Sequence, residues 1–102
     1  MPSNRWSEDD RKCAILWRLA RSHGWANWIP GSDLIRAVPS HERGAARSTL
    51  DALREEPYVA YQPRRGYSIA HDAIERLATT LRDLCGYSEF RIEATLSHFG
   101  GF

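Results

Sequence analysis

Residues 57–70, PYVAYQPRRGYSIA, carry the clearest β-structure pattern in the chain. Two short runs rich in tyrosine and branched residues, 58–61 and 67–70, flank the segment Pro-Arg-Arg-Gly at 63–66. Residues of these types favour extended strands, and proline and glycine between two such runs are typical of a turn. The stretch therefore predicts a β-hairpin with Arg64 and Arg65 at its tip.

The segment before this hairpin predicts three helices. Ser7 is a suitable N-cap for the first helix, and the acidic residues that follow it favour a helix start. This helix is expected to end near Gly24. A very short strand is expected at 28–29, since Pro30 favours extended geometry in the preceding residue. A second helix is expected over 32–38, and a third is expected from a cap at Ser40 to about residue 55.

The segment after the hairpin predicts two further helices. Asp72 is a candidate N-cap for the fourth helix, and Gly86 is expected to end it. Ser88 is expected to begin the fifth, which carries Phe90, Ile92, Leu96 and Phe99. The fold class is therefore mainly α with a small antiparallel hairpin.

A two-stranded hairpin is only marginally stable in water, so it must pack on the helices or pair with a third strand, for which 28–29 is the candidate. Three helices followed by a small hairpin are the order of elements in the winged helix-turn-helix family. Residues 32–70, SDLIRAVPSHERGAARSTLDALREEPYVAYQPRRGYSIA, resemble the core of that family. The resemblance rests on apolar spacing, the exit turn at 54–57 and the two hairpin strands. The apolar positions are Leu34, Val38, Ala46, Leu50 and Leu53. We expect a winged-helix domain over 1–70 and a C-terminal helical extension over 71–102.

The resemblance implies binding of double-stranded DNA by a transcriptional regulator, with the third helix in the major groove and the 63–66 wing on the backbone or minor groove. Arginine can bind guanine or phosphate through its planar fork. The exposed face of the third helix and the wing tip supply the expected contacts, which are His41, Arg43, Gly44, Arg47, Ser48, Thr49, Arg64 and Arg65. The acidic residues Asp51, Glu55 and Glu56 near the end of that helix oppose phosphate binding.

The fourth helix has an apolar seam of the kind that helices bury against each other. Its positions are Ile74, Leu77, Leu81 and Leu84. One interpretation is that the seam packs on the first helix, and the other is that it forms a homodimer interface. We expect a dimer, because a twofold protein can bind two half-sites. Phe99 and Phe102 favour a docked C-terminus.

Cys13 and Cys85 lie in helical patterns without metal-ligand spacing. We expect two buried thiols in a cytoplasmic protein, although the sequence leaves a disulfide between them open. The four histidines, at 23, 41, 71 and 98, lie far apart in the chain. We expect neither a metal nor a cofactor.

The composition indicates a globular protein, with 42% hydrophobic and 26% charged residues in 102 and no apolar run that could cross a membrane. The formal net charge is only +1, so attraction to an anion must come from local clusters of arginine. No nucleophile elbow, P-loop, zinc-protease or dinucleotide motif occurs, and we expect no enzyme activity. The near-neutral charge keeps a second hypothesis open, in which a winged helix serves as a protein-protein interaction module.

Overall fold

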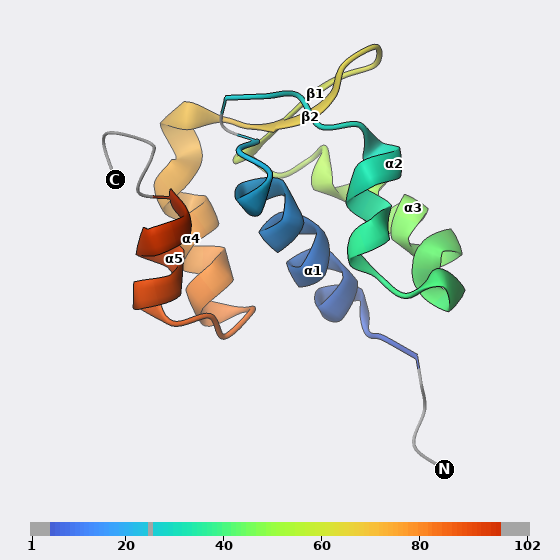
Figure 1. Ribbon diagram of the computed structural model, residues 1–102, viewed down its shortest axis with the longest axis horizontal. Coiled ribbons are helices and arrows are strands. Elements are labelled where there is room, and N and C mark those ends of the chain that lie inside the picture. The colour runs from blue at the N-terminus through green and yellow to red at the C-terminus, as the bar shows by residue number, and fades with distance from the viewer. Residues whose placement is uncertain (1–4, 25, 97–102) are drawn as a thin grey trace.

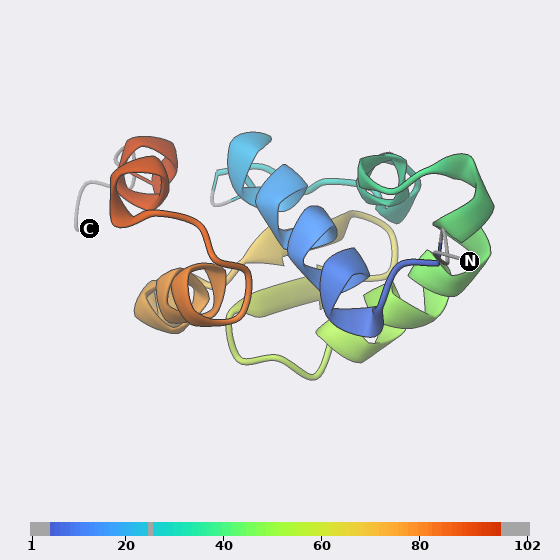
Figure 2. The ribbon, with the colours of Figure 1, turned by 90° about the horizontal axis from the view of Figure 1, so that it is seen from below.

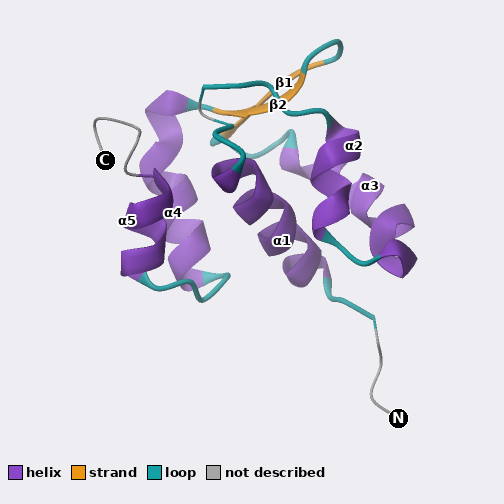
Figure 3. Ribbon diagram, in the orientation of Figure 1, coloured by secondary structure: helices purple, strands orange, loops and turns teal. Residues whose placement is uncertain are grey.

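The computed structural model describes residues 5–24 and 26–96, which form a mainly helical fold with one small antiparallel hairpin (Figures 1 and 3). The fold class expected from the sequence is confirmed at this level. Within these ranges, no helix combines the length and apolar character needed to cross a membrane. The elements in chain order are α1 (Glu8–Arg21), α2 (Gly31–Leu34), the 3₁₀ turns η1 (Ile35–Ala37) and η2 (Ser40–Glu42), α3 (Arg43–Leu53), β1 (Val59–Gln62), β2 (Gly66–Ile69), the 3₁₀ turn η3 (His71–Ala73), α4 (Ile74–Asp83) and α5 (Glu89–Leu96).

Helix α1 begins as expected and ends differently. The Ser7 hydroxyl accepts from the backbone N–H of Asp10, whose carboxylate accepts from the N–H of Ser7, a reciprocal capping box. At the other end His23, not Gly24, has the left-handed conformation, with φ 58°. The N–H of Gly24 donates to the Leu19 carbonyl at 3.0 Å. Glycine at position 24 lets the backbone approach Leu19 this closely, since a Cβ would lie 2.7 Å from that carbonyl oxygen.

Two of the expected N-caps are wrong. Ser40 and Asp72 both lie in 3₁₀ turns, so α3 and α4 begin a few residues later than the sequence predicts, at Arg43 and Ile74. No side-chain capping bond is present at the start of either helix. By contrast, the Ser88 hydroxyl accepts from the N–H of Arg91 at 3.2 Å, and α5 begins where predicted.

The hairpin forms as predicted and gains a third extended segment. β1 pairs with β2 in antiparallel register, with Tyr61 opposite Tyr67. Ile29 forms an isolated bridge with Tyr67 through two backbone hydrogen bonds, of 2.8 and 2.9 Å. Gly66 allows this close approach: its φ is 104°, and a Cβ there would lie 2.3 Å from the Ile29 carbonyl oxygen. The bridge therefore attaches the hairpin to the chain between α1 and α2.

Helix α1 occupies the centre of the molecule. Figure 2 shows α4 and α5 at one end and α2 and α3 at the other, and α1 contacts each of them as well as β2. Within the described residues, the apolar side chains buried in this core are Ile15, Leu16, Leu19, Ala20, Leu34, Val38, Ala46, Leu50, Leu53, Tyr58, Val59, Tyr67, Ile69, Leu77, Leu81, Ile92 and Leu96.

The apolar seam of α4 faces inward. Leu77 and Leu81 are fully buried within the chain, Ile74 packs partly against the core, and Leu84 is 43% exposed. The assignment of Leu77 and Leu81 to a dimer interface is therefore wrong for this fold, because α1 and α5 contact α4 and complete the core around it. On α5, Ile92 and Leu96 are buried whereas Phe90 is exposed, and Phe99 and Phe102 lie outside the described residues.

Cys13 and Cys85 form a disulfide, so the expected pair of free thiols is wrong. Cys13 lies on α1 and Cys85 follows the end of α4; they are 72 positions apart in the sequence, and their Cα atoms lie 5.5 Å apart. The bond ties the C-terminal pair of helices to the central helix.

Candidate nucleic-acid interface

The exposed face of α3 carries four of the residues expected to contact DNA. Arg43, Gly44, Arg47 and Ser48 are all solvent-exposed. A Cβ added at Gly44 would have no neighbour within 4 Å, so the packing of the chain does not require glycine at this position. The N-terminal half of α3 is therefore open to an approaching partner.

Thr49 is wrong as a contact residue, because it is 1% exposed. Its hydroxyl donates to the Ala45 carbonyl and accepts from Arg11 Nε, both at 3.3 Å. Ala46, Leu50 and Leu53 define the buried face of α3, and Thr49 lies on the side of that face nearest α1.

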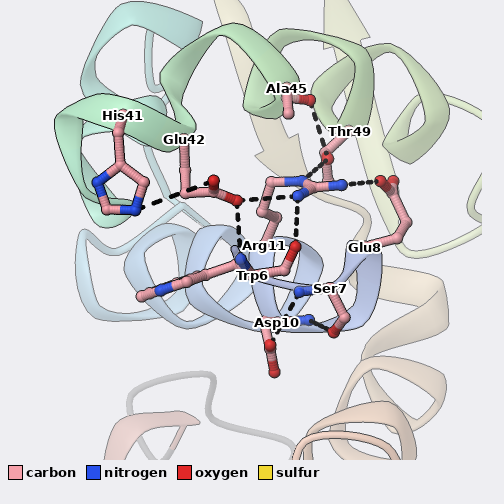
Figure 4. A network of polar contacts seen from close by, with 9 residues as sticks. All are labelled: Trp6, Ser7, Glu8, Asp10, Arg11, His41, Glu42, Ala45 and Thr49. Atoms are coloured by element: carbon pink, nitrogen blue, oxygen red, sulfur yellow. Dashed lines mark hydrogen bonds and ion pairs between the residues drawn. The ribbon is translucent and has the colours of Figure 1, made fainter. Parts of the chain in front are cut away.

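A polar network holds the start of α3 against α1 (Figure 4). The carboxylate of Glu42, which is only 5% exposed, accepts from Arg11 Nη1 and from the backbone N–H of Trp6, both at 3.0 Å. Arg11 also donates to the Trp6 carbonyl at 2.8 Å and forms an ion pair with Glu8 at 2.9 Å. The second Glu42 oxygen lies 4.0 Å from Nε2 of His41, a half-exposed side chain on η2.

This network explains why Glu42 is buried although it is charged. A buried carboxylate is tolerated when it is paired with a cation and hydrogen-bonded, and Oε1 of Glu42 meets both conditions through Arg11 and the Trp6 N–H. Glu42 immediately precedes the exposed arginines of α3, so the network fixes the orientation of the helix face that carries them.

A groove lies beside the tip of the hairpin. Its volume is about 290 Å³, and it brings together the hairpin, the start of α2 and the residue that follows α3. Arg64 and Arg65 at the tip of the hairpin are both exposed and line this groove. The described residues lining the groove are Pro30, Gly31, Arg54, Tyr61, Pro63, Arg64, Arg65, Gly66 and Tyr67.

Arg54 is the residue in this groove that the sequence analysis left out of the predicted site. Its guanidinium lies 3.8 Å from the centroid of the Tyr61 ring, a cation–π contact. Its Nε donates to the Tyr67 hydroxyl at 3.3 Å, and this bond is the main cause that raises the pKa of Arg54 above its usual value. The side chain is therefore a positioned, permanently charged group.

The signal for Arg54 was present in the sequence. Arg47 and Arg54 lie seven residues apart, on the same side of the helix, and Tyr61 and Tyr67 alternate along the hairpin strands. What the pattern could not show is that the two tyrosines pair across the strands, with ring centroids 4.8 Å apart, and face the end of α3. Tyr67 is buried in the core, and Tyr61 packs partly against it.

Most of the positive charge on α3 and at the hairpin tip is uncompensated within the described residues. Within the described residues, none of Arg43, Arg47, Arg64 and Arg65 forms an ion pair with a carboxylate. Arg65 lies 6.0 Å from the centroid of the Trp28 ring. Asp51, an expected source of repulsion, pairs with Arg54 at 3.2 Å, and Glu56 pairs with Lys12 at 2.8 Å. These two carboxylates are partly neutralised by the chain itself.

The predicted residues form two groups. Arg64 and Arg65 share the groove with Arg54, whereas Arg43, Gly44, Arg47 and Ser48 lie on α3 outside its lining. In Figure 1 the hairpin tip is at the upper right and the start of α3 at the lower right, with α2 between them. The two groups thus lie along one edge of the molecule.

No group of three or more histidine, cysteine, aspartate or glutamate side chains in the described part of the chain is placed to hold a metal ion. The arrangement offers cations, hydroxyls and aromatic rings, which suit an anionic partner. Comparison of the chain with protein-family models, curated proteins and solved structures gave no significant match.

Proposed function

We propose that this protein binds double-stranded DNA as a small transcriptional regulator of the winged helix-turn-helix type. The N-terminal half of α3 enters the major groove, and the 63–66 wing contacts the backbone or the minor groove. The observation that carries the proposal is the groove that Arg54, Arg64 and Arg65 line, together with the exposed Arg43 and Arg47 of α3, which form no ion pair within the described residues.

The physical argument is one of charge placement. A chain with a net charge of +1 has little overall attraction for DNA, so local groups must supply the phosphate contacts. Arg54 is held in place by Tyr61 and Tyr67, which reduces the entropy lost when it binds a phosphate. Arg47, one turn beyond the start of α3, is free to contact a base edge.

The first test measures binding of purified protein to random-sequence duplex DNA over a range of salt concentrations. We expect affinity to fall steeply with salt, and Arg65→Ala to weaken binding to all sequences and reduce the salt slope by about 1. Arg47→Ala is expected to weaken binding and also relax sequence preference. Arg76→Ala, an equal loss of charge at an exposed position on α4, is the control and should bind as the parent does. Parental binding by both Arg47 and Arg65 variants would show that the assigned face is wrong.

Gly44→Ala gives a sharper test of close approach on α3. The added methyl group meets nothing within 4 Å, so the variant should fold and gain at most about 0.5 kcal/mol of helix stability, since residue 44 is the second of α3 and not in its middle. If DNA lies against this backbone, the same methyl group should weaken binding. The measurement pairs a urea unfolding curve with a DNA titration. A variant that is both more stable and equally tight in binding would contradict contact at Gly44.

A second function is favoured by exposed apolar residues at the other end of the molecule. Phe90 is 82% exposed and Leu84 is 43% exposed, which suits a protein-protein interaction module. If the parent shows no salt-dependent binding to DNA, this function replaces the first.

We propose further that the protein acts as a homodimer in the cytoplasm, where its DNA would lie. Of the four residues assigned to the dimer seam, only Leu84 and the partly buried Ile74 remain available for it. The disulfide is unusual for a reducing compartment, so the state of Cys13 and Cys85 in the cell bears directly on this location. Light scattering would give the oligomeric state, and a monomer mass would contradict the dimer.

A further inference from the structure

A second cationic cavity lies away from the hairpin, between the C-terminal half of α1, the turn η1 and Tyr87. Its volume is about 520 Å³, which is in the range of small-molecule sites. The described residues that line it are Ala14, Trp17, Arg18, Arg21, Ser22, Arg36, Ala37 and Tyr87. None of them is acidic.

Three arginines line this cavity, and no acidic residue lines it beside them. Arg18 and Arg21 come from α1 and Arg36 from η1, and within the described residues none of them forms an ion pair or a side-chain hydrogen bond. The Nε of Arg18 is buried and has no hydrogen-bond partner among residues 5–24 and 26–96. Like charges repel each other, and a bound anion would relieve the repulsion among these three arginines.

The remaining lining adds an aromatic wall. Trp17 and Tyr87 stack with ring centroids 4.1 Å apart and an interplanar angle of 14°, and both line the cavity. Arg91 lies 5.1 Å from the centroid of each ring. This pair gives the cavity an apolar surface beside the guanidinium groups, as a site for a molecule with a ring and a charged end requires.

We propose that this cavity binds a small phosphomonoester that carries a planar ring. The phosphate accepts hydrogen bonds from Arg18, Arg21 and Arg36, and the ring lies against Trp17 and Tyr87. A phosphate fits better than a carboxylate, because three arginines line the site and a phosphate has three terminal oxygens and a larger charge. The proposal goes beyond DNA binding and does not rest on it.

The test is calorimetric titration of the full chain with phenyl phosphate, in parallel with inorganic phosphate, benzoate and the uncharged benzyl alcohol. We expect phenyl phosphate to bind most tightly and benzyl alcohol not to bind. Arg18→Gln and Arg36→Gln should each lower the affinity for phenyl phosphate about tenfold or more, since each removes a charge-assisted hydrogen bond. Arg76→Gln, with the same loss of charge on α4, should leave the affinity unchanged.

Arg36 is exposed, so its variant keeps the test usable if the half-buried Arg18 proves necessary for folding. Absence of binding by phenyl phosphate would overturn the proposal, and so would equal weakening by Arg76→Gln, which would indicate attraction by general charge. Equal affinity for inorganic phosphate would overturn the role of the aromatic wall, and tighter binding of benzoate would overturn the phosphate assignment. No DNA is present in this experiment, so its outcome is independent of the proposed function.

Discussion

Glu42→Ala is expected to lower the free energy of unfolding by about 3 kcal/mol or more. Glu42 is 5% exposed, and its Oε1 accepts two hydrogen bonds, from Arg11 Nη1 and from the N–H of Trp6. Removing the carboxylate leaves the Trp6 N–H without its acceptor in a site with little access to water. It also takes from Arg11 its buried partner, although the bonds of Arg11 to Glu8 and to the Trp6 carbonyl remain. Loss of one member of a buried pair costs more than the pair itself contributes, because the other member remains desolvated.

Glu8→Ala is the matched control for this prediction. Glu8 pairs with the same arginine at 2.9 Å, but its side chain is 57% exposed, so its loss should cost about 1 kcal/mol or less. Glu42→Gln keeps an acceptor for the Trp6 N–H and loses only the charge, so it should fall between the two. Urea unfolding of the three variants gives the comparison, and equal effects of Glu8→Ala and Glu42→Ala would contradict the role of burial.

Glu42→Ala should also affect the start of α3, which carries part of the candidate DNA site. Glu42 precedes Arg43 directly, and the network joins this point to α1. Relative to the parent, we expect amide hydrogen exchange in the Glu42→Ala variant to become faster in the first turn of α3 and to change less in its last turn. The proposed contacts at Arg43 and Arg47 would then lose their fixed orientation.

Breaking the disulfide is expected to lower the free energy of unfolding by about 2–4 kcal/mol, because the bond closes a long loop and restricts the unfolded chain. The two cysteines are 72 residues apart in sequence, so the restriction is large. The variant Cys13→Ser with Cys85→Ser removes the bond without leaving a reactive thiol. It should unfold at lower urea concentration than the oxidised parent.

Reduction supplies the control for this second prediction. A reductant should destabilise the parent by a similar amount and leave the double serine variant unchanged. Hydrogen exchange should become faster mainly in α4 and α5, which the bond ties to α1. If the oxidised parent and the double variant unfold at the same urea concentration, the bond contributes no stability.

Patterns confined to neighbouring residues allowed most of the fold to be predicted. The hairpin at 57–70, the cap at Ser7 and the start of α5 at Ser88 depend on contacts within a few residues, and each is confirmed. The caps at Ser40 and Asp72 failed for a local reason as well, since 3₁₀ turns precede both helices. A 3₁₀ turn and a first α-helical turn have similar sequences, so the pattern cannot distinguish them.

The candidate site was only partly predictable, because burial depends on what packs against each face. Arg43, Arg47, Arg64 and Arg65 are exposed as expected. Thr49 is buried because Arg11 of α1 covers it, a contact between residues 38 apart in sequence. The placement of Arg54 beside the hairpin likewise depends on how the strands leave α3.

The amino-acid sequence by itself determined the order of helices, the position of the hairpin and the two arginines at its tip, since these follow from short-range propensity and turn chemistry. Only the tertiary structure decided three features. It paired Cys13 with Cys85, it buried Leu77 and Leu81 inside the chain, and it brought three arginines together on each of two surfaces. The physical reason is the same in each case: these features join residues far apart in the chain, and packing around α1 selects which of them meet.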